Sequence, residues 1–347
     1  MSAVSSTRTA FGRVATRSRA TPNLAPACSR CNSTSSKPNP YNPLNSSTPP
    51  PSSPSSTNGD GPTTHFGFKT VPQSVKESLV GHVFTSVSPK YDLMNDSMSL
   101  GIHRLWKESF VNAMVPRLSP SVHSNVNQSI PGSISGWENW TPTLKCLDVA
   151  GGTGDIALKI LDKAREKYGN RDVEVEIVDL NEGMLHEGQK RVAKTVYYNT
   201  PQISFTHGNA QSLPKHIQDN SIDIYTIAFG IRNCTSLEAV LKEAHRVLKP
   251  GGRLGVLEFG KVQNPLFKEV YKQYSFNFIP LMGQLLAGDR DSYQYLIESI
   301  ERFPTQVEFA RLVQEAGFQT GELREGKGGA WTDYTNGICT FWRGVKA

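Results

Sequence analysis

Residues that could hold a charged small molecule are concentrated between Lys145 and Asp155. The segment reads Lys-Cys-Leu-Asp-Val-Ala-Gly-Gly-Thr-Gly-Asp, an apolar run followed by a glycine-rich turn. Apolar residues then recur at helical spacing, at Ile156, Ala157, Ile160, Leu161 and Ala164. The pattern predicts a buried strand, a turn whose backbone can approach a ligand closely, and a helix that begins at Asp155.

Three interpretations of this turn are open. The spacing Gly152-x-Gly154-x-x-Ala157 fits the dinucleotide pattern, in which a helix N-terminus binds phosphate. The turn also resembles the nucleoside-methionine site of S-adenosylmethionine methyltransferases, where an acid precedes the glycines. An ordinary turn between a strand and a helix is the third. Asp148 favours the methyltransferase, because its carboxylate would repel a pyrophosphate but could hold the ammonium group of a bound amino acid.

The first residues have the composition of a targeting segment. Residues 1–59 contain six basic residues and no Asp or Glu, among many Ser and Thr, and no apolar run there is long enough for a secretory signal or a membrane span. We therefore predict a mitochondrial transit peptide over residues 1–32, although a merely disordered basic tail would share this composition. Residues 33–64 are rich in Ser and Pro, cannot bury a core, and are predicted to be a linker.

The basic leader accounts for the net charge of +6, because the remaining residues carry equal numbers of acidic and basic groups. A body without excess positive charge argues against nucleic acid as its main partner. Residues 65–347 are predicted to form one domain. Cys28-x-x-Cys31 lacks a second pair of ligands, so we interpret it as chance rather than a zinc site.

Three longer motifs identify a family. In chain order they are Tyr91-Asp92-x-Met94-Asn95-x-x-Met98-Ser99-x-x-x-His103-x-x-Trp106, the run from Arg246 to Phe259, and Asp289-x-Asp291-Ser292-Tyr293-x-Tyr295-Leu296-x-x-Ser299-Ile300-x-x-Phe303-Pro304. They closely resemble the signatures of the ubiquinone/menaquinone biosynthesis C-methyltransferase family. With His65-Phe66-Gly67-Phe68 ahead of them, they are similar to its mitochondrial branch, the methyltransferases of coenzyme Q synthesis. Residues 119–143 interrupt the resemblance, and we interpret them as a surface insertion.

This resemblance implies S-adenosyl-L-methionine-dependent C-methylation of 2-methoxy-6-polyprenyl-1,4-benzoquinol in ubiquinone biosynthesis, without a metal. It also implies a protein bound peripherally to the matrix side of the mitochondrial inner membrane. A homodimer and membership of a multi-subunit coenzyme Q synthesis complex are further expectations. Two other classes of function stay open: a nicotinamide-dependent oxidoreductase, and a non-catalytic scaffold in a quinone-synthesis assembly.

The rest of the chain alternates predicted strands and helices. Besides the strand before the glycine turn, strands are predicted at 173–178, 203–207, 222–229 and 253–259 and near 319–324 and 338–343, with helices at 75–87, 237–248 and 306–316. Such alternation predicts an α/β fold in which helices cover both faces of a parallel sheet. The resemblance implies a class I S-adenosylmethionine-dependent methyltransferase fold, which is Rossmann-like with a seven-stranded, mostly parallel sheet, and N-terminal lid helices.

Candidate cofactor residues follow the ends of strands, where ligands bind in such sheets. Asp179 ends the second strand and can accept from both ribose hydroxyls, although an oxidoreductase would place an acid there too. Asn209 and Ala210 follow the third strand and are assigned to the adenine. The other candidates lie in and before the glycine turn: Asp148, Gly152, Thr153 and Gly154. For each residue the alternative is a plain capping role.

The turn after the fourth strand, residues 229–233, is the candidate for the chemistry. An aromatic carbon accepts a methyl group once a ring hydroxyl has lost its proton, and a free phenol has a pKa of about 10. Family models give the matching arginine a part in proton removal. Because a guanidinium stays protonated, we assign Arg232 to stabilising the phenolate, the alternative being a salt bridge that holds the turn.

The remaining catalytic candidates come from this turn and from the first family motif. Asn233 and Tyr91 are assigned to orienting the ring. The base is a water molecule or a lid group such as Asp92 or His103. A prenyl tail would need an apolar channel, for which a later segment offers material that could equally be a buried helix: Phe276, Phe278, Ile279, Leu281, Met282, Leu285 and Leu286.

Overall fold

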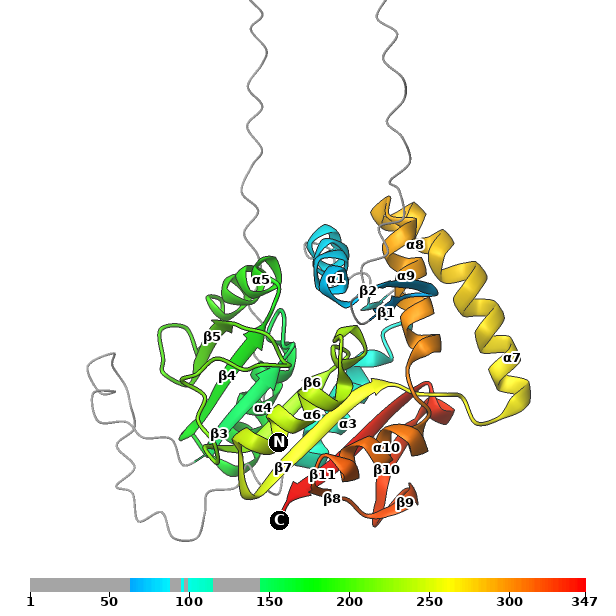
Figure 1. The fold of residues 1–347 in the computed structure, drawn as a ribbon. Helices are drawn as coiled ribbons and strands as arrows, with labels where there is room; N and C mark the ends of the chain where they lie inside the picture. Colours follow the sequence, from blue (N-terminus) through cyan, green and yellow to red (C-terminus); the bar gives the residue numbers. More distant parts are fainter. Residues whose placement is uncertain (1–62, 88–94, 97–98, 115–143) are drawn as a thin grey trace, which may run out of the picture. The chain divides into compact units, whose positions relative to one another are not determined.

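The computed structural model describes residues 63–87, 95–96, 99–114 and 144–347, which belong to one compact unit (Figure 1). The predicted transit peptide, the insertion at 119–143 and the candidate catalytic residues Tyr91 and Asp92 lie outside the described residues. So does most of the predicted linker. Strand β1 begins at Thr63, so the last two residues assigned to the linker belong to the fold.

A nine-stranded sheet forms the centre of the described part (Figure 1). Its order is β5-β4-β3-β6-β7-β11-β10-β9, and β8 pairs with β11. The strands from β5 to β7 are parallel, whereas β11 is antiparallel to both β7 and β10. The strands are β3 (Leu144–Val149), β4 (Val173–Asp179), β5 (Ile203–His207), β6 (Ile222–Ala228), β7 (Leu248–Phe259), β8 (Phe318–Gln319), β9 (Glu322–Glu325), β10 (Gly329–Tyr334) and β11 (Cys339–Lys346).

The α/β fold with a mostly parallel sheet is confirmed, but the predicted number of seven strands is wrong for the described residues. The strand expected near 319–324 is two short strands, β8 and β9, and β10 was not predicted. Strand β10 begins with Gly329 and contains Asp333, two residue types that are depleted in strands. Antiparallel pairing with β11 outweighs this weak local preference.

Helices cover both faces of the sheet. On one face, α3 (His103–Met114), α4 (Asp155–Tyr168) and α5 (Glu182–Val192) pack against β3 and β4. On the other, α6 (Leu237–Val247) and α10 (Gln306–Glu315) pack against β6 and β7. Beyond Lys145 and Asp223, near their starts, strands β3 and β6 are therefore apolar on both sides, except for Asp148 and Thr226, which have no exposed surface. A buried carboxyl group is costly, so this pair needs a purpose other than packing.

The N-terminal elements are attached to helices that follow much later in the chain. Strands β1 (Thr63–Phe66) and β2 (Lys69–Pro72) form a hairpin that the sequence did not predict, and α1 (Gln73–Val87) is the expected first helix. The ring of Phe66 stacks on Tyr295 of α9 (Arg290–Arg302), with centroids 4.2 Å apart. Asn181, before α5, donates to the carbonyl oxygen of Gly81 at 3.2 Å.

The chain between β7 and α10 is helical. It contains α7 (Pro265–Gln273), a π-helical turn (Tyr274–Phe278), α8 (Ile279–Ala287) and α9. Figure 1 shows α7 and α8 in yellow and orange, away from the central sheet. This segment includes the residues offered as a prenyl channel or a buried helix, of which Phe278 and Leu281 are exposed. The side chains of Met282, Leu285 and Leu286 are outside the description.

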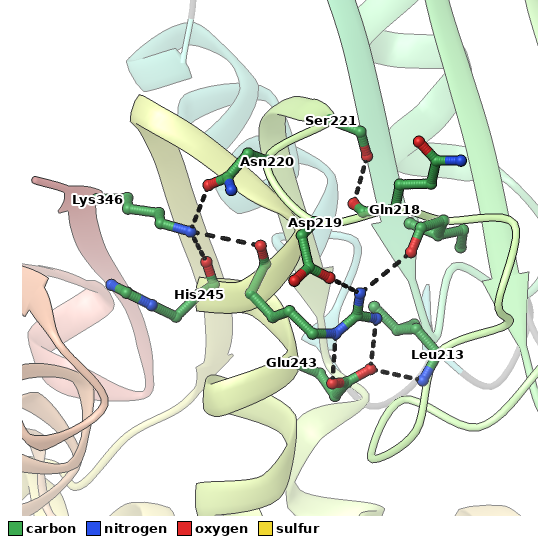
Figure 2. Close-up of polar contacts among 10 residues, drawn as sticks. Leu213, Gln218, Asp219, Asn220, Ser221, Glu243, His245 and Lys346 are labelled. Atoms are coloured by element: carbon green, nitrogen blue, oxygen red, sulfur yellow. Dashed lines mark hydrogen bonds and ion pairs between the residues drawn. The ribbon is translucent and has the colours of Figure 1, made fainter.

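A polar network fixes the loop that follows β5 against α6 (Figure 2). Arg246 donates to both carboxylate oxygens of Glu243 at 2.8 Å and to Asp219 at 2.6 Å. Glu243 also accepts from the backbone N–H of Leu213, at 2.8 Å. Asn209, a candidate ligand residue, lies near the start of the same loop, so the network helps to fix its position.

We expect Arg246→Lys to lower the free energy of unfolding by about 1–2 kcal/mol, because an ammonium group cannot reproduce the two parallel bonds to Glu243. Lys190→Met is a matched control, since it breaks the exposed Lys190–Glu187 pair of 2.7 Å. It should change the free energy by less than about 0.5 kcal/mol. Urea unfolding of both variants measures the difference. Equal effects would show that the network stabilises no more than an exposed ion pair.

Candidate functional site

A cavity of about 210 Å³, here called the first cavity, lies at the carboxyl ends of β3, β4, β5 and β6, with α1 and α3 completing its wall. Most of the predicted site residues line it: Asp148, Gly152, Thr153, Asp179, Asn209, Ala210 and Asn233. Gly154 is not among its lining residues. Its left-handed backbone, with φ of 76°, instead starts α4.

The buried Asp148 has one oxygen without a partner. Thr226 donates to Oδ1 at 2.7 Å, whereas Oδ2 has no hydrogen-bond partner among the described residues. Burial raises the pKa of this carboxyl group to about 7. Residue 151 has to be glycine, because a Cβ there would come within 2.7 Å of Oδ2. The first cavity therefore contains an unsatisfied buried acceptor that a cationic group would satisfy.

Asp179 is held by the backbone. Its Oδ2 accepts from the N–H of Gly152 at 2.9 Å, and its Oδ1 accepts from the N–H of Asn181 at 2.8 Å. Burial raises its pKa to about 6, although these two hydrogen bonds oppose the shift. Each carboxylate oxygen can accept a further bond. Asp179 is thus pre-oriented at the cavity with acceptor capacity for a diol.

Helix α1 reaches the same cavity from the N-terminal part of the chain, as expected of a lid helix. Glu77 accepts from the side-chain amides of Asn209, at 2.9 Å, and Gln211, at 3.0 Å, and both Glu77 and Phe84 line the cavity. Glu77 and Gln211 were not predicted from the sequence. No sequence signal identifies Glu77, because it lies 132 residues from Asn209 and belongs to no glycine or strand-end pattern.

A second cavity of about 320 Å³ adjoins the first. Its wall comes from α3, the end of β7, α7, the π-helical turn and α9, and is mostly apolar and aromatic: Trp106, Phe229, Phe259, Val262, Phe267, Tyr271, Phe276, Ile279, Leu296 and Ile338. Phe276 and Ile279 belong to the predicted prenyl channel. Phe229 and Lys107 line both cavities, so these two side chains stand where the cavities meet.

His103 contributes a proton acceptor to the second cavity. Ser99 donates its hydroxyl hydrogen to the carbonyl oxygen of Asn95 at 2.7 Å, so Ser99 Oγ must accept from His103 Nδ1, 2.8 Å away. The Nε2 atom then carries the lone pair, and Asp96 is too distant from it, at 3.8 Å, for a hydrogen bond. Burial, assisted by Lys107, lowers the pKa of His103 to about 4, so the ring is neutral near pH 7.

Arg232 is enclosed in a buried ion pair. Its Nη1 donates to Glu258 at 2.8 Å and to the carbonyl oxygen of Phe229, and its Nε donates to Ser299 at 3.3 Å. Only 3% of its side chain and none of that of Glu258 is exposed. Arg232 is not among the residues that line either cavity. These contacts favour the alternative in which it holds the turn, while its assignment to the phenolate stays a prediction.

Asn233 follows Arg232 in the same turn and lies at the first cavity. Its Oδ1 accepts from the hydroxyl of Tyr295 at 3.1 Å, and this bond leaves the amide N–H groups for another partner. The backbone before it is strained, because Phe229 has φ of 56°, which is uncommon for an aromatic residue. Ala150, at the end of β3, has φ of 51°. Strained backbone at two neighbouring strand ends is typical of functional sites.

The sheet order, the glycine turn after β3 and the acid at the end of β4 define a class I S-adenosylmethionine-dependent methyltransferase fold. The chain belongs to the ubiE/COQ5 methyltransferase family, whose model matches residues 72–346. S-adenosylmethionine is the methyl donor in this family.

Relatives of known name are similar over most of their length. A mitochondrial 2-methoxy-6-polyprenyl-1,4-benzoquinol methylase of Schizosaccharomyces pombe is 50% identical over 82% of this chain and 84% of its own. The protein of that name in Dictyostelium discoideum is 44% identical over 83% of this chain and 87% of its own. The ubiquinone/menaquinone biosynthesis C-methyltransferase of Roseobacter denitrificans is 47% identical over 77% and 94%.

The first cavity fits the methyl donor of this family. The unpartnered Oδ2 of Asp148 suits the ammonium group of its methionine part, and the spare acceptor capacity of Asp179 suits the two ribose hydroxyls. Asn209 and Ala210 follow β5 at the same cavity, where an adenine edge and face could be met. The donor set therefore agrees with the family assignment.

We expect the affinity for S-adenosylmethionine to rise between pH 5.5 and 7.5. The raised pKa of Asp148, about 7, means that its carboxyl group is protonated below this pH, and only the ionised form can pair with an ammonium group. Asp179, with a pKa of about 6, contributes to the same rise at lower pH. Titration calorimetry across this range measures the effect.

Asp148→Asn is the control for this pH dependence. It should bind at least about tenfold more weakly at pH 7.5, since it loses a charge-assisted bond. It should also remove the part of the pH dependence centred near pH 7 and leave the part due to Asp179. A pH dependence identical to that of the wild type would mean that Asp148 does not bind the ammonium group.

Proposed function

We propose that this protein transfers a methyl group from S-adenosylmethionine to a ring carbon of 2-methoxy-6-polyprenyl-1,4-benzoquinol in ubiquinone biosynthesis. Mitochondrial relatives that carry this name are 42–50% identical over about four fifths of the chain. The observation that carries the proposal is the junction of two cavities at Phe229 and Lys107. One cavity has the polar groups for the methyl donor and the other has the apolar wall for a prenylated ring.

Residues of the first cavity would hold the donor: Asp148, Gly152, Thr153, Asp179, Asn209 and Ala210. When bound, S-adenosylmethionine supplies an electrophilic methyl group, and its sulfur keeps the electron pair of the broken C–S bond. Glu77 and Phe84 of α1 cover this cavity and would exclude water from it.

The residues of the second cavity would prepare the ring. A ring hydroxyl loses its proton to water by way of Nε2 of His103, whose low pKa of about 4 means that it passes the proton on rather than keeping it. The carbon that has received the methyl group then loses its proton to water, and the ring oxygen regains one from water. From the adjoining first cavity, Asn233 would orient the ring through its free amide hydrogens. Tyr91 is again assigned to orienting the ring, and Asp92 to proton transfer. Arg232 donates to the carbonyl oxygen of Phe229 and so helps to fix that residue. A direct contact between Arg232 and the phenolate is also proposed.

The apolar wall of the second cavity would hold the start of the polyprenyl tail. Phe276, Ile279 and Leu296 lie along it, while Leu100 and Ile102 at the rim are exposed. No helix of the described residues is both long and apolar enough to cross a bilayer. We propose a peripheral protein on the matrix side of the inner membrane, as a homodimer within a coenzyme Q synthesis complex.

Mitochondrial import is proposed on the composition of residues 1–59 and on the mitochondrial relatives. We expect cleavage before the His65 motif, because residues 1–59 have the acid-free, basic composition of a transit peptide. N-terminal sequencing of the protein purified from mitochondria checks this. A mature chain that still begins at Met1 or Ser2 would contradict cleavage.

The reaction is tested with a short-tailed 2-methoxy-benzoquinol that is kept reduced. We expect one methylated product for each S-adenosylhomocysteine formed, with the new methyl group on a ring carbon by mass spectrometry and NMR. Asp179→Ala is the control, because it should weaken binding of S-adenosylmethionine about tenfold or more while the fold survives. A wild-type protein that binds the donor and forms no product would refute the proposed substrate.

A further inference from the structure

Lys107 occupies the junction of the two cavities. It belongs to α3, one helical turn after His103, and only 6% of it is exposed. Its ammonium group pairs with Asp155 at 2.8 Å, and this is its one ion pair within the described residues. An ammonium group has three hydrogens, so donors remain after this contact. No other cationic side chain lines both cavities in the described part of the chain.

The other cations near the second cavity are less suited to a buried anion. Lys261 donates to the carbonyl oxygens of Ile300 and Glu301, at 2.9 and 2.6 Å. Lys268 and Lys272 are exposed on α7. Arg232 is already paired with Glu258, and its side chain lines neither cavity. Lys107 is therefore the buried cation that a reacting ring would meet.

We infer that Lys107 is a catalytic residue that stabilises the ionised hydroxyl of the ring while the proton leaves by way of His103. The inference rests on the proposed function. In this step the O–H bond breaks, its electron pair stays on the oxygen beside Lys107, and the proton passes through Nε2 of His103 to water. Methylation of the ring carbon and loss of its proton to water complete the exchange described above.

Asp155 gives the ammonium group its position. Although burial by itself would raise the pKa of Asp155, Lys107 keeps that pKa below its usual value, so the carboxylate stays ionised. Pairing with Asp155 also reduces the repulsion between Lys107 and a cationic donor in the first cavity. Arg191 of α5 lies 3.9 Å from the same carboxylate.

The other charged groups around Lys107 come from every neighbouring element. Glu77 of α1, Asp148 of β3 and Asp179 of β4 line the first cavity with it, and Lys159 of α4 acts on Asp155. Asp96 and His103 lie on the side of the second cavity, together with Lys261, Lys268, Lys272 and Glu301. The charges of Arg232 and Glu258 offset one another in their ion pair, and Arg232 also donates to the carbonyl oxygen of Phe229. The titration of a bound phenol thus depends mainly on Lys107 and His103.

The test uses a coloured phenol, 2-methoxy-4-nitrophenol with a short 6-alkyl chain, bound in the presence of S-adenosylhomocysteine so that no methyl transfer occurs. The ratio of ionised to neutral probe is read from its absorbance at fixed pH. On the wild-type protein we expect this ratio to be at least about tenfold higher than in solution, which is one pKa unit. An unchanged ratio overturns the inference, whatever the variants do.

Three variants locate the effect. Lys107→Met should bring the ratio back to within about threefold of the free probe, whereas Lys107→Arg should retain most of the increase, because it keeps the charge. Lys163→Met is the matched control, since the Lys163–Glu108 pair of 2.6 Å also joins α3 to α4 but lines neither cavity. It should behave as the wild type.

Thermal unfolding shows whether the variants are folded, and Lys107→Gln replaces Lys107→Met if the latter is not. A folded Lys107→Met or Lys107→Gln with the wild-type ratio overturns the inference. Turnover separates the two proposals. A wild-type protein that methylates the benzoquinol but does not ionise the probe contradicts only the role of Lys107. A wild-type protein without turnover contradicts the proposed reaction itself.

Discussion

The buried ion pair of Arg232 and Glu258 is the contact on which the site depends. Through it the turn after β6, the end of β7 and Ser299 of α9 are joined in one hydrogen-bonded group. Removing two charges from water is costly, and the cost is offset only when the remaining donors and acceptors are satisfied. Here the backbone N–H of Phe259 and the carbonyl oxygen of Phe229 satisfy them. As a result, Phe229, the residue that separates the two cavities, is fixed in position.

The two cavities divide the chemistry by polarity. Buried carboxyl groups with raised pKa values, Asp148 and Asp179, face the first cavity, where a cationic and hydroxyl-rich ligand would satisfy them. The second cavity has aromatic walls and a neutral histidine. Helix α3 borders both, so His103 and Lys107, one turn apart, reach the ring from the same element. A single helix can thereby set the distance between a proton acceptor and a cation.

Long-range contacts complete the site from both ends of the chain. Glu77 of α1 binds the amides of Asn209 and Gln211, and Trp106 of α3 donates to Thr335, 229 residues later, at 2.8 Å. The hairpin of β1 and β2 packs against α9 through the stacked rings of Phe66 and Tyr295. Helix α1 is therefore part of the enclosure of the first cavity, and helices α7 to α9 are part of that of the second.

The sequence by itself determined the strands from β3 to β7, the glycine turn and six of the seven cofactor candidates that now line the first cavity. These features have local causes: apolar runs make the strands, and in a parallel sheet the residues after them meet at one edge. The family motifs also marked His103 and Trp106 as unusual, without fixing what they contact. Strand β10 escaped prediction because its stability comes from pairing with β11 rather than from its own residues.

Only the tertiary structure decided which charged groups meet the cavities. Arg232 and Lys107 are both basic residues beside a motif, and nothing in their spacing says that one is enclosed with Glu258 while the other borders both cavities. That difference arises from packing between separate segments: Arg232 meets Glu258, 26 residues later, and Ser299, 67 residues later. The tautomer of His103 and the free oxygen of Asp148 follow in the same way from hydrogen bonds that form only when the chain is folded. Local spacing specifies elements and their ends, whereas burial and pairing, which set charge and reactivity, belong to the assembled fold.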